Sequence, residues 1–125
     1  MIAVIFEVIP AEGHKAAYLD IAAKLRPLLD EVDGFISVER FQSITDPSKM
    51  LSLSFFRDET ALANWRSLAE HRAAQKAGRD GIFEGYRLRV SSVMRDYGPD
   101  TGRDQAPADS NETHGCPFLS ERDET

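Results

Sequence analysis

The order in which hydrophobic periodicity changes over the first 97 residues most constrains how this chain can fold. Residues 2–9 are mostly β-branched or aromatic and end at Pro10, which is typical of a strand. From Glu12 onward, apolar side chains recur at steps of three and four, the spacing of one helix face. Along the chain, these two periodicities predict strand 2–9, helix 12–32, strand 35–44, strand 50–56, helix 59–77 and strand 82–97.

This order, β-α-β-β-α-β, predicts an α+β fold of the ferredoxin-like class, in which one antiparallel sheet carries both helices on one face. Pro27 lies within the first helix and predicts a kink or a break near Arg26, because proline lacks the amide hydrogen that an inner helical turn uses. Asp58 is expected to cap the second helix, and Gly78 is expected to end it.

The two faces of the predicted sheet differ in composition. Alternation assigns to the helix-covered face Val4, Phe6, Val8, Ile36, Val38, Leu51, Leu53, Phe55, Leu88 and Val90. It assigns to the opposite face Ile5, Glu7, Ser37, Glu39, Phe41, Ser52, Ser54, Phe56, Arg87 and Arg89. Because an exposed patch of large apolar side chains marks an interface, we expect a homodimer in which two such faces pack together. A monomer with a mixed outer face is the alternative.

Charge is unevenly distributed along the 125 residues. Residues 1–98 hold 13 Lys and Arg against 14 Asp and Glu, whereas residues 99–125 hold 2 against 7, so nearly all of the net charge of −6 lies in the last part. We therefore predict a domain at 1–98 and an acidic C-terminal extension at 99–125. The extension is too poor in apolar residues to fold alone, and Phe118 and Leu119 are its expected anchor on the domain or on a partner subunit.

The composition also excludes several partners and chemistries. A nearly neutral domain argues against binding to nucleic acid or to an anionic membrane, since phosphates are bound by clustered Lys and Arg. No apolar run is long enough to cross a membrane, and the first residues lack the basic region of a secretion signal, so we expect a cytoplasmic protein. The single cysteine, Cys116, excludes a disulfide framework and a Cys-based zinc cluster within one chain, and we predict no metal site.

Trp65 and His71 are the residues for which we predict a catalytic role. Both can reach the space between the second helix and the sheet, and histidine titrates near neutral pH, which suits proton transfer. The alternatives are a tryptophan of the core and a half-exposed histidine bonded to a neighbour. Arg72, on the inward stripe, needs a carboxylate such as Glu84 or an anionic ligand. The side chains expected to bind a substrate are Phe6, Asn64, Arg72 and Tyr86.

The segment Ile-Pro-Ala-Glu-Gly after the first strand, and the pair Trp65 and His71 within Trp-Arg-Ser-Leu-Ala-Glu-His-Arg, resemble the antibiotic biosynthesis monooxygenase family. The resemblance covers residues 1–97. It implies a dimeric α+β barrel, in which two ferredoxin-like subunits join through their sheets. It also implies that Trp65 is a pocket tryptophan and that His71 holds a proton-handling position. The family's pocket asparagine falls on Ala61 here, with Asn64 as its substitute.

The resemblance implies a reaction as well. Enzymes of this family oxygenate electron-rich polycyclic phenols to quinones without metal or flavin, which implies a small cofactor-independent monooxygenase, an oxidoreductase acting on an aromatic phenol-like or quinol-like substrate. A second hypothesis is haem binding or degradation, because Cys116-Pro117 with His114 nearby resembles a motif of haem-responsive proteins. A haem-degrading branch of the superfamily carries an asparagine where this chain has Phe6. The third hypothesis is a non-catalytic dimeric barrel that binds a metabolite.

Overall fold

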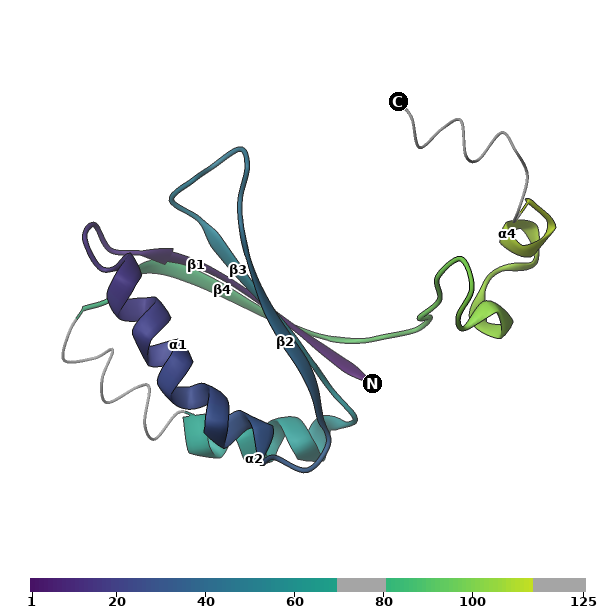
Figure 1. The fold of residues 1–125 in the computed structure, drawn as a ribbon, viewed down its shortest axis with the longest axis horizontal. Coiled ribbons are helices and arrows are strands. Elements are labelled where there is room, and N and C mark those ends of the chain that lie inside the picture. The colour runs from purple at the N-terminus through teal and green to yellow at the C-terminus, as the bar shows by residue number, and fades with distance from the viewer. Residues whose placement is uncertain (70–80, 114–125) are drawn as a thin grey trace. The chain divides into compact units, whose positions relative to one another are not determined.

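The computed structural model describes residues 1–69 and 81–113, which group into two compact units, the first at Met1–Ser92 and the second beginning at Val93. The described elements of the first unit are β1 Ile2–Pro10, α1 Lys15–Asp30, β2 Phe35–Gln42, β3 Met50–Phe56, α2 Glu59–Ala69 and β4 Phe83–Ser92 (Figure 1). They follow the predicted order. The predicted end of the second helix, at Gly78, lies outside the described residues.

The four strands form one antiparallel sheet in the order β2-β3-β1-β4, and both helices lie on one side of it (Figure 1). This arrangement confirms the predicted ferredoxin-like α+β fold. The inner strand β1 pairs with β3 and with β4, so that Ile2 lies opposite both Phe56 and Ser92. Because directly paired residues point to the same face of a sheet, this register fixes which side chains face the helices.

Among the described residues, buried side chains form two clusters at opposite ends of the helix-covered face. Each cluster combines side chains of β1 and β3 with side chains from a helix. The first contains Ile2, Leu29, Phe56, Ala61 and Leu62, and the second contains Val8, Tyr18, Met50 and Ile82. Burying a large apolar side chain contributes about 1.5–3 kcal/mol relative to leaving it exposed, so the clusters hold the helices against both ends of the sheet.

The structure corrects the predicted faces of β3. Ile2 lies opposite Phe56, so the even-numbered residues of β1 and β3 face the helices together, and Phe56 is only 1% exposed. The prediction was wrong because both faces of β3 carry large apolar side chains, and alternation alone does not say which set is covered. The faces are therefore exchanged: Ser52, Ser54 and Phe56 face the helices, whereas Leu51, Leu53 and Phe55 face away.

β2 also departs from the prediction. Its pairing with β3 shifts between Phe35 and Ser37, so Ile36 falls in an irregular position and is 51% exposed instead of lying on the helix-covered face. Phe35 packs on the core in its place, with its ring centroid 5.8 Å from that of Phe56. The strand ends at Gln42, two residues before the predicted Ile44.

The last strand is shorter than the predicted 82–97. β4 ends at Ser92 because Ser92 lies opposite Ile2, where β1 begins, and later residues have no strand partner in β1. The boundary between the two units follows Ser92 for the same reason. It precedes the predicted division between Gly98 and Pro99.

α1 runs through Pro27 without the predicted break. The helix continues to Asp30, and beyond it the backbone N–H of Val32 donates to the carbonyl oxygen of Leu29 at 3.1 Å. Leu29 is 5% exposed in the first cluster. Burial of this side chain therefore holds the turn that follows the proline.

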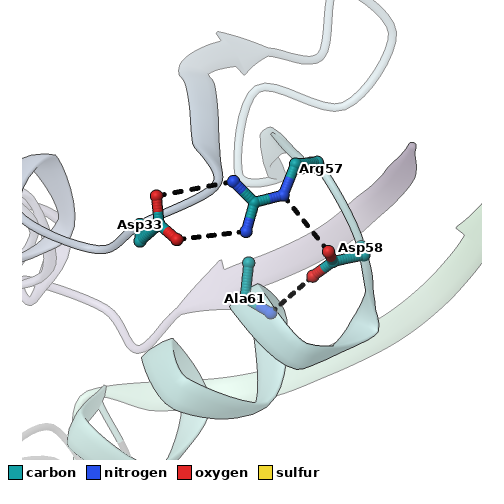
Figure 2. Close-up of polar contacts among 4 residues, drawn as sticks. All are labelled: Asp33, Arg57, Asp58 and Ala61. Carbon is teal, nitrogen blue, oxygen red and sulfur yellow. Dashed lines mark hydrogen bonds and ion pairs between the residues drawn. The ribbon is translucent and has the colours of Figure 1, made fainter.

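Asp58 caps α2, which confirms the prediction. Its Oδ1 accepts a hydrogen bond from the backbone N–H of Ala61 at 2.9 Å (Figure 2). Arg57 donates to Asp58 at 3.2 Å and to Asp33, in the turn before β2, at 3.1 Å (Figure 2). The hydrogen bond from Ala61 and the Arg57 guanidinium together hold the pKa of Asp58 below its ordinary value. The start of α2 is thereby joined to the turn that follows α1.

Variants of Asp58 test this cap. Because the pKa of Asp58 is lowered in the folded protein, its stabilising effect is present above the ordinary aspartate pKa of about 3.9 and is lost as pH falls through the lower folded value. Asp58→Asn keeps an acceptor for the Ala61 N–H but cannot ionise. We therefore expect its melting temperature at pH 7 to lie between those of wild type and Asp58→Ala, with less dependence on pH between about 5 and 2. Thermal unfolding by circular dichroism measures this, and a wild-type acid dependence in Asp58→Asn would contradict it.

The second unit is organised by hydrogen bonds around Arg103. It contains the 3-10 helix η2 Arg103–Gln105 and the helix α4 Ala108–Thr113. Arg103 donates from Nη1 to the Gly98 carbonyl oxygen at 2.9 Å and from Nε to Asn111 at 3.1 Å. Its guanidinium also lies 5.3 Å from the centre of the Tyr97 ring. One arginine thus provides local order where the composition predicts no apolar core, while the predicted anchors, Phe118 and Leu119, lie outside the described residues.

Candidate functional site

The candidate site is the centre of the helix-covered face, between the two buried clusters. Paired residues form two rows across the sheet there, with one residue from each strand. The rows are Val38, Ser54, Val4 and Val90, and then Arg40, Ser52, Phe6 and Leu88. All of these residues are half-buried or exposed, and each row contains a serine. Val4 and Val38 pack in part against the first cluster and Phe6 against the second, and a mostly apolar surface with a few polar groups suits a small organic ligand.

The β4 side of this face is accessible. Val90 is 46% exposed, Leu88 is 50% exposed, and Tyr86, the next residue on the same face, is 68% exposed. Large apolar side chains that remain exposed on the helix side of a sheet provide contact area for a ligand.

Phe6 and Tyr86, two of the predicted substrate-binding residues, lie side by side in the structure. Their ring centroids are 5.8 Å apart, and Phe83 lies 6.0 Å from Phe6 and 6.3 Å from Tyr86. Phe6 packs on the second cluster, which holds its ring in place. These three rings form one aromatic wall of the site, and Phe83 is a member that sequence reasoning missed.

Trp65 belongs to the opposite end of the face. It is half-buried and packs against the first cluster, as does Val4 of the candidate site. Asn64, the residue before it, is exposed on α2. Ala61, where the resemblance places an asparagine, is 1% exposed, and its Cβ lies 2.7 Å from where a side chain on Gly34 would begin. A larger polar side chain at position 61 would therefore displace the core.

Arg40 is a polar residue of the site that sequence reasoning missed. Its Nε is buried and has no hydrogen-bond partner among the described residues. A signal was available, because Arg40 has the same strand parity as Val38 and so belongs to the helix side. Ser52 and Ser54 were missed because the predicted faces of β3 were exchanged.

Several predicted residues fall on segments outside the described ranges. They are His71 and Arg72 of the predicted site, and His114 and Cys116 of the haem hypothesis.

Within residues 1–69 and 81–113, no group of three or more His, Cys, Asp and Glu side chains could hold a metal ion. None of the helices in these ranges combines the length and the apolar character needed to span a bilayer.

The opposite face of the sheet, called the outer face below, is more apolar than predicted. With the faces of β3 exchanged, Leu51, Leu53 and Phe55 lie beside Ile5 on it. Phe41, paired with Leu51 on the edge strand β2, is 42% exposed. The outer face therefore carries large apolar side chains on three strands, and all but Phe41 are half-buried.

Glu7 is the charged residue nearest the middle of the outer face. One of its carboxylate oxygens accepts a hydrogen bond from Arg89 at 3.1 Å, and the other lies 3.5 Å from Lys49 Nζ. The hydrogen bond from Arg89 and the charge of Lys49 lower the pKa of Glu7. Two hollows of about 290 and 200 Å³ share Glu7 and Lys49 in their linings. Glu7 is thus an ionised, paired group within an apolar surface.

Residues 1–77 match the model of a known family, described as antibiotic biosynthesis monooxygenase. The chain belongs to this family. The Bacillus subtilis protein YqjZ is 30% identical to this chain over 93 residues. These residues cover 74% of this chain and 79% of YqjZ. The Pyricularia oryzae protein named jasmonate monooxygenase ABM is 50% identical over 93 residues. That match covers 74% of the chain but only 43% of the relative, so the chain spans less than half of that relative's length.

A solved structure supports the fold of this antibiotic biosynthesis monooxygenase family member independently. A Deinococcus radiodurans protein assigned to the same family matches with a TM-score of 0.68, over 78% of this chain and 97% of that chain. The sequence identity is 10%, so the likeness shows the fold alone. The family match confirms the family predicted from the sequence, and the solved structure supports the fold.

Proposed function

We propose that this chain is a monooxygenase, which inserts one atom of dioxygen into a small organic substrate on the helix-covered face of its sheet. The observation that carries the proposal is the divided core. Within residues 1–69 and 81–113, the two buried clusters occupy the ends of that face, and the centre is half-buried or exposed, with aromatic, aliphatic and polar side chains. Membership of the antibiotic biosynthesis monooxygenase family supports the type of reaction.

The substrate class that we propose is an electron-rich phenol or quinol, because such a ring supplies its own electrons. When a phenol becomes a quinone, the phenolic O–H bond and one ring C–H bond break. One oxygen atom of dioxygen becomes the new carbonyl oxygen, and the other leaves as water with the two hydrogens. All four electrons that reduce dioxygen come from the substrate, so this balance needs no metal, flavin or external reductant.

The aromatic wall of Phe6, Phe83 and Tyr86 gives a flat ring a surface on which to pack, and Trp65 lies toward the other end of the face. Within the proposal, His71 accepts the phenolic proton, because the phenolate gives up an electron more readily than the phenol. Arg72 provides a further polar contact. The roles of His71 and Arg72 rest on the sequence pattern, and enclosure of the ring would exclude water from the reaction.

Oxygen uptake coupled to loss of a phenol tests the proposed function. With 2-naphthol as a first substrate, we expect His71→Ala to lower kcat about 100-fold or more, the size typical of a lost general base. His14→Ala is the matched control, since His14 lies just before α1 and outside the candidate site. Wild-type turnover in His71→Ala, or an equal loss in His14→Ala, would reject the assigned role.

Jasmonate is the second substrate to test, because the Pyricularia oryzae relative is named for it. It is not a phenol, so insertion of one oxygen atom would require two electrons from a reductant such as a reduced nicotinamide or flavin. Turnover of a phenol should be independent of added reductant, because the phenol itself supplies all four electrons. Jasmonate turnover that depends on a reductant would replace the phenol class in this proposal.

We also propose that two copies of the chain pack through their outer faces. The support is the set of apolar side chains Ile5, Leu51, Leu53 and Phe55 on this face, which are only half-buried in a single chain. Exposed apolar patches of this kind favour association. In such a pair, Glu7 would enter the interface already neutralised by Arg89 and Lys49.

A further inference from the structure

Arg40 differs from the other described arginines in its surroundings. Arg40 and Arg103 are the two that are not exposed. Arg103 donates hydrogen bonds from all three guanidinium nitrogens, to Asn111, Gly98 and Ser110. The Nε of Arg40 is buried and has no partner within the described residues. Since a buried donor without an acceptor is unfavourable, this position points to an acceptor that a ligand brings.

The register places Arg40 inside the candidate site. Arg40 lies opposite Ser52, and Ser52 in turn lies opposite Phe6. Directly paired residues have Cβ atoms about 4.5–5.5 Å apart, so Ser52 is the immediate neighbour of Arg40 across the strands. Phe6 is two strand spacings away, roughly 10 Å from Arg40. Ser54 lies two residues along β3 on the same face, beside Val38.

The carboxylates nearest to Arg40 in the sheet do not pair with it. Glu39 follows the other strand parity and lies opposite Leu53, on the outer face. Glu7 also lies on the outer face, where Arg89 and Lys49 hold it. Among the described residues, neither of these carboxylates therefore pairs with Arg40, and its Nε has no hydrogen-bond partner.

We infer that Arg40, together with the hydroxyl groups of Ser52 and Ser54, binds a carboxylate of the substrate. This inference rests on the proposed function and narrows its substrate to an acid that carries a ring. The guanidinium presents paired N–H groups that match the two oxygens of a carboxylate, whereas a phenolate has only one oxygen. With the carboxylate at Arg40 and the ring on Phe6, the two groups lie roughly 5–10 Å apart.

Equilibrium binding without oxygen tests the inference. The probe is 6-hydroxy-2-naphthoate, which carries its carboxylate and its phenol at opposite ends of a flat ring system. The neutral comparisons are its methyl ester and 2-naphthol. By calorimetric titration under argon, we expect Arg40→Gln to weaken binding of the carboxylate about 10- to 100-fold and to leave binding of both neutral probes unchanged. Arg66→Gln, at an exposed arginine of α2, is the matched control and should bind all three probes as wild type does.

The possible results separate the carboxylate from the phenolate as the group bound. An equal loss of 6-hydroxy-2-naphthoate and 2-naphthol binding in Arg40→Gln would overturn the inference in favour of the phenolate. An unchanged affinity, or no binding of the carboxylate to wild type, would also overturn it. If Arg40→Gln does not fold, Arg40→Lys replaces it, because lysine keeps the charge without the paired N–H groups and should weaken binding of the carboxylate alone.

Failure of the proposed function would give a different result. Binding of 6-hydroxy-2-naphthoate that depends on Arg40, with no oxygen uptake when air is admitted, would leave the carboxylate site standing and reject the monooxygenase. Oxygen uptake with 2-naphthol, and no dependence of any binding on Arg40, would support the monooxygenase and reject the carboxylate site.

Discussion

Ser52→Phe is expected to abolish turnover while the protein stays folded. Ser52 lies in the middle of the candidate site, between Arg40 and Phe6, and is only half-buried. A phenyl ring at this position would occupy the space that we assign to the substrate. Because small misplacements of a substrate cost about 100-fold in rate, we expect kcat/KM for 2-naphthol to fall at least that far.

The control for this variant makes the same chemical change outside the site. Ser67→Phe alters an exposed serine on α2, whose hydroxyl donates to the Ala63 carbonyl oxygen in its own helix, and it should keep wild-type turnover. If position 52 were packed core, the added ring would instead destabilise the protein by about 1–3 kcal/mol. A large drop in melting temperature, or normal turnover in Ser52→Phe, would therefore contradict the location of the site.

With the proposed pairing of outer faces, we expect wild type to be a dimer and Leu53→Lys to be a monomer. Leu53 lies on the outer face between Ile5 and Glu39, its partners on the two neighbouring strands. In a single chain, a lysine there would gain an opposite charge across the strands from Glu39. In a dimer, the same lysine would be buried against the second copy, at a large cost in desolvation. The charge pair with Glu39 stabilises the isolated chain, and the desolvation of the lysine destabilises the dimer, so both effects favour the monomer.

Sedimentation equilibrium measures this change directly. Wild type should sediment at about twice the chain mass of 14.0 kDa, and Leu53→Lys at the mass of one chain. Leu19→Lys, at an exposed leucine of α1, is the matched control and should remain a dimer. A monomeric wild type, or a dimeric Leu53→Lys, would remove the outer face as the interface.

Periodicity was sufficient to predict the fold. Each strand and helix has a hydrophobic repeat of its own type, and the order of the repeats allows few topologies. The exchanged faces of β3 show where this information ends. Leu53 and Phe56 are both large and apolar, so only the pairing of Ile2 with Phe56 in the folded sheet decides which of them is covered. Ile36 was misplaced because a shift in pairing has no signal in alternation.

The candidate site was predictable to a smaller extent. Phe6 and Tyr86 were expected near one another, and the structure places their rings in contact. Trp65 lies on the first cluster, whereas Asn64 points to solvent, because neighbouring residues of a helix lie about 100° apart and only one can face the sheet. The alternation places Arg40 on the same side as Val38, but Arg40 was missed as a site residue because a charged residue on a covered face is rare.

The proposed reaction and its location can be tested together with oxygen labelled as 18O2. Wild type and Ser67→Phe are incubated with 2-naphthol, and the product is reduced at once to prevent exchange of its carbonyl oxygens with water before mass spectrometry. We expect one 18O atom in each product molecule from these two proteins, and at least about 100-fold less product from Ser52→Phe at the same time. Product without 18O, or an equal yield of labelled product from Ser52→Phe, would contradict the account.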